Sequence, residues 1–339
     1  MFKSFPALVA ELSANHNGSF KRALRLIKLA KENHADAVKL QTYNENSMTL
    51  KSLEKKFKIK SGLWKGYSLW KLYNKAKTPY EWHKDLFDYA KKLNIKCFSS
   101  AFDFESINFL EKLNCPIYKI ASFEATDLNL IKEVASTKKP LIISTGLCNI
   151  KEIDSAYNIA IKFGSGKIAL LYCVSSYPAN IDDFNLENIA ILKNRYQCDI
   201  GFSDHSNDNI ISKLAIAKGA TIFEKHIAEK KQKNGFDIKF SLRGEEIKKY
   251  KDDLINAAKI IGKKSFFRSK NESKNLIFRR SVFAIKDIKK GERFTKENIM
   301  TFRPYIGLCA SKYLKMIGKK SIKNIKKNSP LNKRYFNEI

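Results

Sequence analysis

The first 260 residues alternate short apolar, β-branched runs with longer amphipathic stretches, and this alternation constrains the fold more than any other feature. Eight runs are typical of buried strands: 7–12, 36–41, 95–100, 117–121, 140–145, 168–173, 198–203 and 220–226. Patterns typical of helices fall between them, among others at 19–33, 80–93, 104–113, 150–163 and 207–218. Strands separated by helices in this number and length predict an α/β fold, a (β/α)8 barrel of the TIM type.

The alternation stops near Gly262, so we expect a second, smaller domain in the 339-residue chain. We predict a catalytic barrel over 1–262, a basic and polar linker over 263–277, and a small β-rich domain over 278–339. In that domain the phrase DIKKG at 287–291 is weakly repeated as NIKKN at 324–328.

The connection 43–78 is much longer than most loops in a compact domain, and it carries Trp64, Trp70 and Tyr73. Loops of this length are usually functional or disordered. We therefore predict an insertion over the mouth of the barrel.

The formal net charge is +30, from 64 Lys and Arg against 34 Asp and Glu. Residues 262–339 alone hold 22 basic and 5 acidic residues. Such a charge is compatible with a nucleic-acid-binding protein whose barrel has no catalytic part. However, the basic residues are mainly lysines scattered over polar helix faces, without an arginine–aromatic stripe. This favours a solvated surface around an anionic substrate, and we expect no nucleic-acid partner.

No apolar run reaches the roughly 18 residues that a membrane helix needs. Residues 1–6 lack an apolar signal core and lead directly into the first strand-like run. The six cysteines form no CxxC pair, and several lie in apolar runs, as buried thiols do in a reducing compartment. We expect a cytoplasmic protein with no membrane partner.

Polar side chains stand at the carboxyl end of every predicted strand, where barrels of this class carry their active sites. In chain order they are Glu11, Asn15, His16, Lys39, Gln41, Ser99, Ser100, Lys119, Ser122, Glu124, Ser144, Ser175, Ser176, Tyr177, Ser203, Asp204, His205, Glu224 and His226. The bodies of the strands are apolar by contrast. This collection of lysines, carboxylates, hydroxyls and histidines at one rim predicts an enzyme rather than a barrel that only scaffolds partners.

Several of these residues have a structural alternative when each is taken alone. A serine at a strand end, such as Ser144 or Ser203, usually caps the next helix. The carboxylates could be structural ion-pair partners of the lysines, Glu11 of Lys39 and Glu124 of Lys119.

Two of the groups point to particular ligands. His205 and His226 end neighbouring predicted strands, and two imidazoles without cysteine favour a divalent metal ion with open positions. A closed tetrahedral zinc site would need more protein ligands. A phosphate group suits the remaining cluster of one lysine and three hydroxyls: Lys39, Ser122, Ser144 and Ser203. Together these features imply chemistry on a phosphorylated small molecule.

Seven segments in order resemble the sialic acid synthase family. They are 10–18 (AELSANHNG), 38–42 (VKLQT), 118–124 (YKIASFE), 144–146 (STG), 176–178 (SYP), 201–205 (GFSDH) and 224–226 (EKH). The segments 286–292 (KDIKKGE) and 303–304 (RP) resemble the antifreeze-like (SAF) domain of that family. The segments 62–64 (GLW), 76–83 (AKTPYEWH), 11–16 and 121–125 resemble its pseudaminic acid branch.

The resemblance implies a transferase that forms a C–C bond between phosphoenolpyruvate and 2,4-diacetamido-2,4,6-trideoxy-β-L-altropyranose, an N-acetylated amino-hexose. The same mechanism on another sugar, giving legionaminic or N-acetylneuraminic acid, is the alternative. The resemblance also implies a bacterial role in flagellin or surface-glycan glycosylation.

The resemblance assigns roles to individual residues. His205 and His226 would hold Mn²⁺, Mg²⁺ or Co²⁺ against the open-chain aldehyde. The implied catalytic residues are Glu11, Lys119, Glu124 and Asp237. Substrate contacts would come from Lys39, Gln41, Ser100, Ser122, Ser144, Ser175, Tyr177, Ser203 and Arg303. Arg303 would reach the sugar in the partner's barrel, which implies a domain-swapped homodimer.

Overall fold

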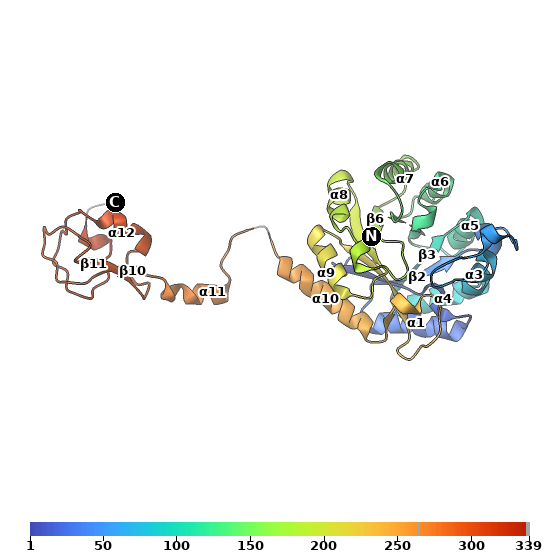
Figure 1. The fold of residues 1–339 in the computed structure, drawn as a ribbon, viewed down its shortest axis with the longest axis horizontal. Coiled ribbons are helices and arrows are strands. Elements are labelled where there is room, and N and C mark those ends of the chain that lie inside the picture. The colour runs from blue at the N-terminus through green and yellow to red at the C-terminus, as the bar shows by residue number, and fades with distance from the viewer. Residues whose placement is uncertain (264, 337–339) are drawn as a thin grey trace. The chain divides into compact units, whose positions relative to one another are not determined.

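The computed structural model describes residues 1–263 and 265–336, and the chain forms two compact units, Met1–Gly262 and Lys263–Ile339. In the first unit eight parallel strands pair in chain order, and the first also pairs with the eighth, so the sheet closes (Figure 1). The strands are β1 (Ala7–Glu11), β2 (Ala37–Thr42), β3 (Lys96–Ala101), β4 (Tyr118–Ile120), β5 (Leu141–Ser144), β6 (Ile168–Cys173), β7 (Asp199–Asp204) and β8 (Ile222–Ala228). The predicted (β/α)8 barrel is confirmed, and a two-residue strand, β9 (Leu242–Arg243), extends it beside β8.

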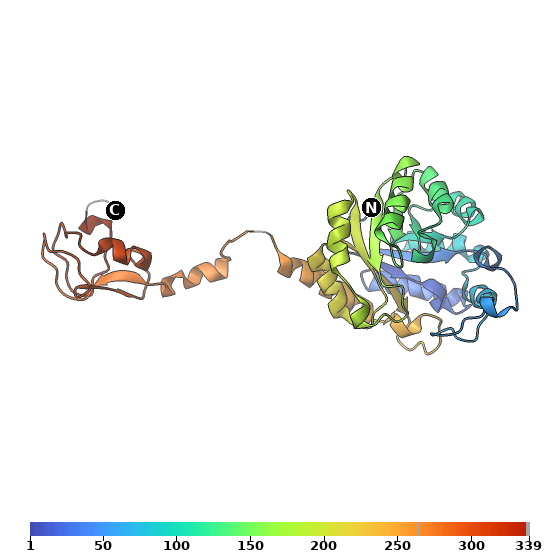
Figure 2. The same cartoon turned by 45° about the horizontal axis from the view of Figure 1, so that its top comes forward.

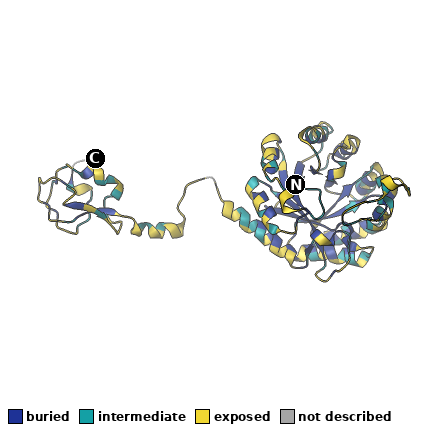
Figure 3. Cartoon of the chain, in the orientation of Figure 1, coloured by how far each residue is buried: buried dark blue, intermediate teal, exposed yellow. Residues whose placement is uncertain are grey.

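Helices surround the barrel, with their outer faces exposed and the strands buried (Figures 2 and 3). They are α1 (Phe20–Glu32), α4 (Tyr80–Lys92), α5 (Phe104–Lys112), α6 (Leu128–Ser136), α7 (Ile150–Lys162), α8 (Glu187–Arg195), α9 (Asn209–Lys218) and α10 (Glu246–Ile261). Five begin at a side chain that accepts a backbone N–H of the first turn, namely Ser19, Asp103, Asp127, Asn149 and Asp208. The helix after β5 is capped by Asn149, and the helix after β7 is capped by Asp208. The helix-cap alternative for Ser144 and Ser203 is therefore wrong.

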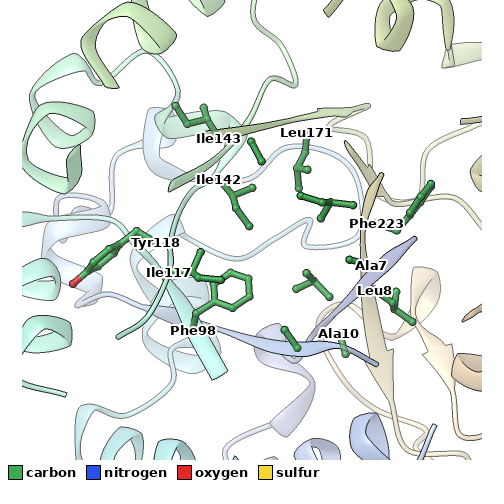
Figure 4. Close-up of a cluster of buried hydrophobic side chains, with 14 of the residues drawn as sticks. Ala7, Leu8, Ala10, Phe98, Ile117, Tyr118, Ile142, Ile143, Leu171 and Phe223 are labelled. Carbon is green, nitrogen blue, oxygen red and sulfur yellow. The ribbon is translucent and has the colours of Figure 1, made fainter. Parts of the chain in front are cut away.

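Side chains along each strand alternate between the barrel interior and the surrounding helices. In the core, Phe98, Ile117 and Ile142 point inward, whereas Tyr118 and Ile143 point outward (Figure 4). Two residues further along the same strands, the same alternation turns the next side chains inward at the carboxyl end: Ser100, Lys119 and Ser144. The apolar core therefore ends in a polar layer built on rigid strands.

The segment 43–78 forms an insertion that contains α2 (Glu45–Met48) and α3 (Leu69–Ala76). At its end His83 of α4 fastens it to the barrel, with Nε2 2.8 Å from Thr42 Oγ1 of β2 and Nδ1 3.0 Å from the carbonyl oxygen of Pro79. In its middle, the indole N–H of Trp64 donates to the carbonyl oxygen of Phe236, between β8 and β9. The chain is thus held just after the insertion to the last residue of β2, and in the middle of the insertion to the segment after β8.

The second unit has its own small core around a two-stranded antiparallel sheet, β10 (Ser281–Ala284) and β11 (Ile299–Phe302), with α12 (Tyr313–Met316). Ile288 and Ile325 exchange two backbone hydrogen bonds of 2.8 Å, so the two weakly repeated segments pair with each other. The segment 263–277 contains α11 (Lys270–Lys274) and the first residues of a 3-10 turn, Asn275–Phe278. Among the described residues, no helix is long and apolar enough to cross a membrane.

Candidate active site

A chain of ion pairs crosses the carboxyl end of the barrel. Lys39 of β2 pairs with Glu11 of β1 and lies 3.8 Å from Glu224 Oε2 of β8. Lys119 of β4 donates to both oxygens of Glu224 at 3.2 Å. All four residues are at most 4% exposed, so two positive and two negative groups share a buried polar layer.

The electrostatics of this layer differ between its two carboxylates. Burial raises the pKa of Glu11, although Lys39 opposes the shift. Burial also disfavours the charge of Glu224, but Lys119 and Lys39 outweigh it and hold the pKa of that carboxyl below its ordinary value. Glu224 is therefore the permanent anion that holds the lysines, and Glu11 accepts a proton more readily.

Hydroxyl and amide groups surround the ion pairs. Lys39 donates to Ser100 Oγ at 3.1 Å, and Ser203 Oγ donates to Glu224 Oε1 at 3.1 Å. Gln41 Nε2 lies 3.3 Å from Glu11 Oε1 and 3.1 Å from Ser13 Oγ. These side chains occupy the inward positions of β2, β3 and β7, next to the charged residues.

A second group of small polar side chains meets at Gly146, just after β5. The Gly146 N–H donates to Ser122 Oγ at 3.2 Å, and Cys173 Sγ lies 2.9 Å from the same oxygen. A Cβ atom at Gly146 would come within 2.3 Å of Ser175 Oγ and 2.6 Å of Cys173 Sγ. Glycine is required here because three side chains, from the ends of β4 and β6, converge on its backbone.

The two histidines face each other across the same rim, with ring centroids 5.5 Å apart. His205 Nδ1 lies 3.1 Å from the carbonyl oxygen of Val174; the contact assigns the proton to Nδ1 and leaves Nε2 with a free lone pair. Burial lowers the pKa of His205 to about 4 and that of His226 well below its ordinary value. Both rings are therefore neutral near pH 7, the form that binds metal ions.

His226 Nδ1 is buried and has no hydrogen-bond partner among the described residues. It lies 3.6 Å from Asp237 Oδ2, which Ser13 Oγ contacts closely. A buried nitrogen without a hydrogen-bond partner costs free energy unless a ligand binds to it, so His205 and His226 fit a divalent metal ion. Within the described ranges, no group of three or more His, Cys, Asp or Glu is arranged to hold a metal. An ion on these two ligands would keep positions for water and substrate.

Ser144 Oγ and Glu124 Oε2 are also buried without a hydrogen-bond partner among the described residues. Burial raises the pKa of Glu124 to about 7. A carboxyl with that pKa is half protonated near neutral pH and can give or take a proton. Burial also raises the pKa of Asp237, against the effect of Ser13.

A cavity of about 410 Å³ opens above these groups. Its polar floor includes Gln41, Glu124, His226 and Asp237. Its walls are mainly apolar and come largely from the insertion: Tyr43, Met48, Trp64, Leu69, Leu72 and Tyr73. Tyr43 packs edge-on against Tyr73 at 5.8 Å and Phe102 at 5.3 Å, measured between ring centroids. A polar ligand with apolar substituents is what such a cavity accommodates.

The site gathers most of the residues predicted from the sequence, from all eight strand ends. The ion pair expected between Glu11 and Lys39 is present. The one expected between Glu124 and Lys119 is wrong, because Lys119 pairs with Glu224. Trp64 lines the cavity, whereas Trp82 packs against His16 and Phe20. Arg303 follows β11 in the second unit and is exposed.

Sequence reasoning gave no role to Ser13 or Cys173, and it named Glu224 only as one of the polar residues at the rim. The inward alternation of β6 and β8 was a usable signal for Cys173 and Glu224, because each is two residues from another inward position. The contact between Ser13 and Asp237 joins residues 224 positions apart, and no local sequence pattern predicts it.

Residues 26–266 match the NeuB family, and residues 279–333 match the SAF domain. The pseudaminic acid synthase of Campylobacter jejuni subsp. jejuni serotype O:2 is 43% identical over 94% of this chain and 93% of its own length. That of Helicobacter pylori is 41% identical over 96% of each chain. The N,N'-diacetyllegionaminic acid synthase of the same Campylobacter jejuni strain is less similar, with 37% identity over 95% of this chain and 97% of its own.

Among solved structures, the fold matches N-acetylneuraminic acid (sialic acid) synthetase from Leptospira borgpetersenii serovar Hardjo-bovis in complex with citrate. The TM-score is 0.71 and the identity 31%, over 80% of this chain and 90% of that one. The similarity in sequence thus extends through both units, and the barrel architecture is shared with a crystallographically determined relative.

Proposed function

The chain belongs to the NeuB family, and from this premise we propose that it is a pseudaminic acid synthase. It condenses phosphoenolpyruvate with 2,4-diacetamido-2,4,6-trideoxy-β-L-altropyranose in its open-chain form. C3 of phosphoenolpyruvate bonds to the aldehyde carbon, water adds at C2, and phosphate leaves. Phosphoenolpyruvate, sugar and water thereby become pseudaminic acid and phosphate.

The observation that carries the proposal is an apolar cavity whose polar floor adjoins the buried charged layer, since Gln41 lines the cavity and its Nε2 lies 3.3 Å from Glu11 Oε1. The charged layer suits the phosphate and carboxylate of phosphoenolpyruvate. The apolar walls suit the C6 methyl group and the two acetamido methyl groups of the sugar. N-acetylmannosamine carries hydroxyl groups at C4 and C6 instead, and burying them without partners costs free energy.

Phosphoenolpyruvate is bound, in this proposal, by the lysines and hydroxyls of the polar layer. Lys39 and Lys119 balance its negative charges, and the Gly146 cradle offers an N–H and hydroxyls to its oxygens. The unsatisfied Ser144 Oγ supports the same assignment, because a buried hydroxyl without a partner accommodates an anionic ligand. The assigned residues are Lys39, Ser100, Lys119, Ser122, Ser144, Ser175 and Ser203.

The remaining polar groups hold the sugar and move protons. The aldehyde oxygen gains negative charge as the C–C bond forms and needs a proton, which Glu124 can donate because its pKa is about 7. Tyr177 lies beside His205, with ring centroids 4.5 Å apart, and orients the reacting carbon. Glu11, Gln41 and Asp237 contact the sugar or the water that adds at C2.

His205 and His226 would hold the divalent ion, with Mn²⁺, Mg²⁺ and Co²⁺ as the candidate ions. When bound, such an ion stabilises negative charge on the aldehyde oxygen. The free lone pair of His205 Nε2 and the unsatisfied Nδ1 of His226 support this assignment. Their neutral state near pH 7 means that no proton has to be displaced for the metal to bind.

The active species in this proposal is a domain-swapped homodimer in which Arg303 reaches the sugar in the barrel of the partner copy. Arg303 is exposed beside apolar side chains that are unusually accessible: Phe302 is 46% exposed and Ile306 57%. A cation next to accessible apolar side chains is typical of an interface, where arginine is enriched.

The proposal is tested by measuring phosphate release from phosphoenolpyruvate with Mn²⁺, comparing the trideoxy-altrose with N-acetylmannosamine. We expect release with the altrose only, and its loss with EDTA and in His226→Ala. Release with N-acetylmannosamine or the legionaminic precursor instead would keep the reaction class and overturn the substrate. Release with none of these sugars would overturn the proposed function.

A further inference from the structure

We propose that Asp204 and Lys225 are positioning residues that hold His205 and His226 in the geometry for binding a divalent metal ion. The inference rests on the proposed function, since it takes the two histidines as the metal ligands. It concerns the outer face of the barrel wall, which the reaction itself does not use.

Asp204 of β7 and Lys225 of β8 are aligned partners in neighbouring strands. Lys225 Nζ lies 3.2 Å from Asp204 Oδ2, and the exposed fractions of the two residues are 2% and 0%. Each residue directly precedes one of the histidines. Because successive side chains of a strand point to opposite faces, the ion pair lies behind the wall from which the imidazoles project.

The carboxylate of Asp204 is saturated with donors. Oδ1 accepts from the Ser206 N–H at 2.8 Å and from Ser206 Oγ at 2.6 Å, and Oδ2 accepts from Ser212 Oγ at 2.7 Å and Tyr250 OH at 3.1 Å. Lys225 also donates to the Ser206 carbonyl oxygen. The network therefore ties β7, β8, α9 and α10 to the residue that follows His205.

Such a network is a poor way to gain stability alone, because burying two charges costs about as much as their attraction returns. Its effect is geometric. The backbone on both sides of His205 is fixed by Asp204 and Ser206, and Lys225 fixes the residue before His226 relative to the same carboxylate. His205 is held again from the other side by its contact with the Val174 carbonyl oxygen. Groups that hydrogen-bond to metal ligands typically raise metal affinity about 10- to 100-fold, and we expect a loss of this order when the backbone beside both ligands is released.

The chain offers a matched control at a different place in the barrel. Lys251 is 5% exposed and lies 2.5 Å from Asp36 Oδ2, and the same oxygen accepts from the Leu8 N–H at 2.7 Å. This Lys–Asp pair binds α10 to the segment before β2. It is comparable to the first pair in chemistry and in the burial of its lysine, although the Asp36 side chain is 20% exposed, and it adjoins neither histidine.

The test is the dissociation constant of Mn²⁺, measured on the full chain by calorimetry and by electron paramagnetic resonance of the free ion. We expect Lys225→Met to weaken Mn²⁺ binding about 10- to 100-fold. Lys251→Met is expected to lower the midpoint of thermal unfolding to a similar extent and to leave the Mn²⁺ dissociation constant within about twofold. Asp204→Asn keeps the side-chain volume and serves as the second variant, with the same expected loss of affinity.

An unchanged Mn²⁺ affinity in folded Lys225→Met or Asp204→Asn would overturn the inference, as would an equal loss in Lys251→Met. Failure of the proposed function has a different signature: wild type would release no phosphate, or His226→Ala would bind Mn²⁺ as wild type does.

Discussion

The indole N–H of Trp64 donates to the carbonyl oxygen of Phe236 at 3.1 Å, and this bond joins the 43–78 insertion to the segment that carries Asp237. The Trp64 ring also packs against Tyr177, with centroids 5.6 Å apart. One tryptophan therefore closes the cavity wall and connects the apolar part of the site to its polar floor.

Loss of this tryptophan should affect sugar binding more than phosphoenolpyruvate binding. We expect Trp64→Ala to raise the KM for the trideoxy-altrose at least about tenfold, because an apolar wall and a fixed loop are both lost. The KM for phosphoenolpyruvate should change little. Trp70→Phe is the matched control, since the Trp70 N–H donates to Asn46 Oδ1 at 2.8 Å and its ring does not line the cavity. Equal effects on both KM values would contradict this account of Trp64.

The contribution of the Lys119–Glu224 ion pair to stability can be separated from its contribution to activity. Lys119→Met leaves Glu224 buried without its nearest cation and should cost about 3–5 kcal/mol in the free energy of unfolding. Adding Glu224→Leu should recover most of that stability, because the uncompensated charge is removed. Activity should stay absent in both variants. Recovery of phosphate release in the double variant would show that the pair is structural only.

Glu124 should set the alkaline limb of the pH profile. Burial raises its pKa to about 7, so it is protonated below that pH and ionised above it. If the protonated form donates to the aldehyde oxygen, kcat should fall as pH rises through about 7. Glu124→Gln should lower kcat about 100-fold or more and remove this limb. A limb near pH 7 that persists unchanged in Glu124→Gln, measured at saturating substrates, would assign the proton to another group.

The swapped arrangement predicts complementation between two inactive variants. Arg303→Ala lacks the arginine that is offered to the partner, and His226→Ala lacks a metal ligand in its own barrel. Refolding an equal mixture from denaturant should restore about a quarter of the wild-type activity, because half of the dimers are mixed and each has one complete site. Without swapping, no mixed dimer has a complete site. Absence of activity in a mixture that contains mixed dimers would contradict the proposal.

The barrel and its polar rim follow from local patterns, because strand alternation and helix amphipathicity are short-range signals. The inward positions of Lys39 and Lys119 follow from the apolar residues two positions earlier in the predicted strands, Ala37 and Ile117. The partners of the ion pairs cannot be predicted from this alternation. Lys119 reaches Glu224 across the barrel, 105 residues along the chain, and the outcome depends on the closed geometry of the sheet.

The cavity walls were equally beyond local reasoning. Tyr43, Tyr73 and Phe102 meet because an insertion folds back over the strand ends, and a loop has no period from which to read its contacts. The different roles of Trp64 in the insertion and Trp82 in α4 become apparent only in three dimensions. Trp64 borders the cavity, whereas Trp82 is packed against His16, 5.4 Å away between ring centroids.

The central claim is that this site joins phosphoenolpyruvate to the trideoxy-altrose, and the most direct measurement is the product itself. Purified chain, both substrates and Mn²⁺ would be incubated, and the mixture would be followed by ¹H and ³¹P nuclear magnetic resonance. The account predicts pseudaminic acid and phosphate in equal amounts, with the sugar consumed at the same rate. Phosphate accompanied by pyruvate, with the sugar unchanged, would mean hydrolysis without condensation and would contradict the account.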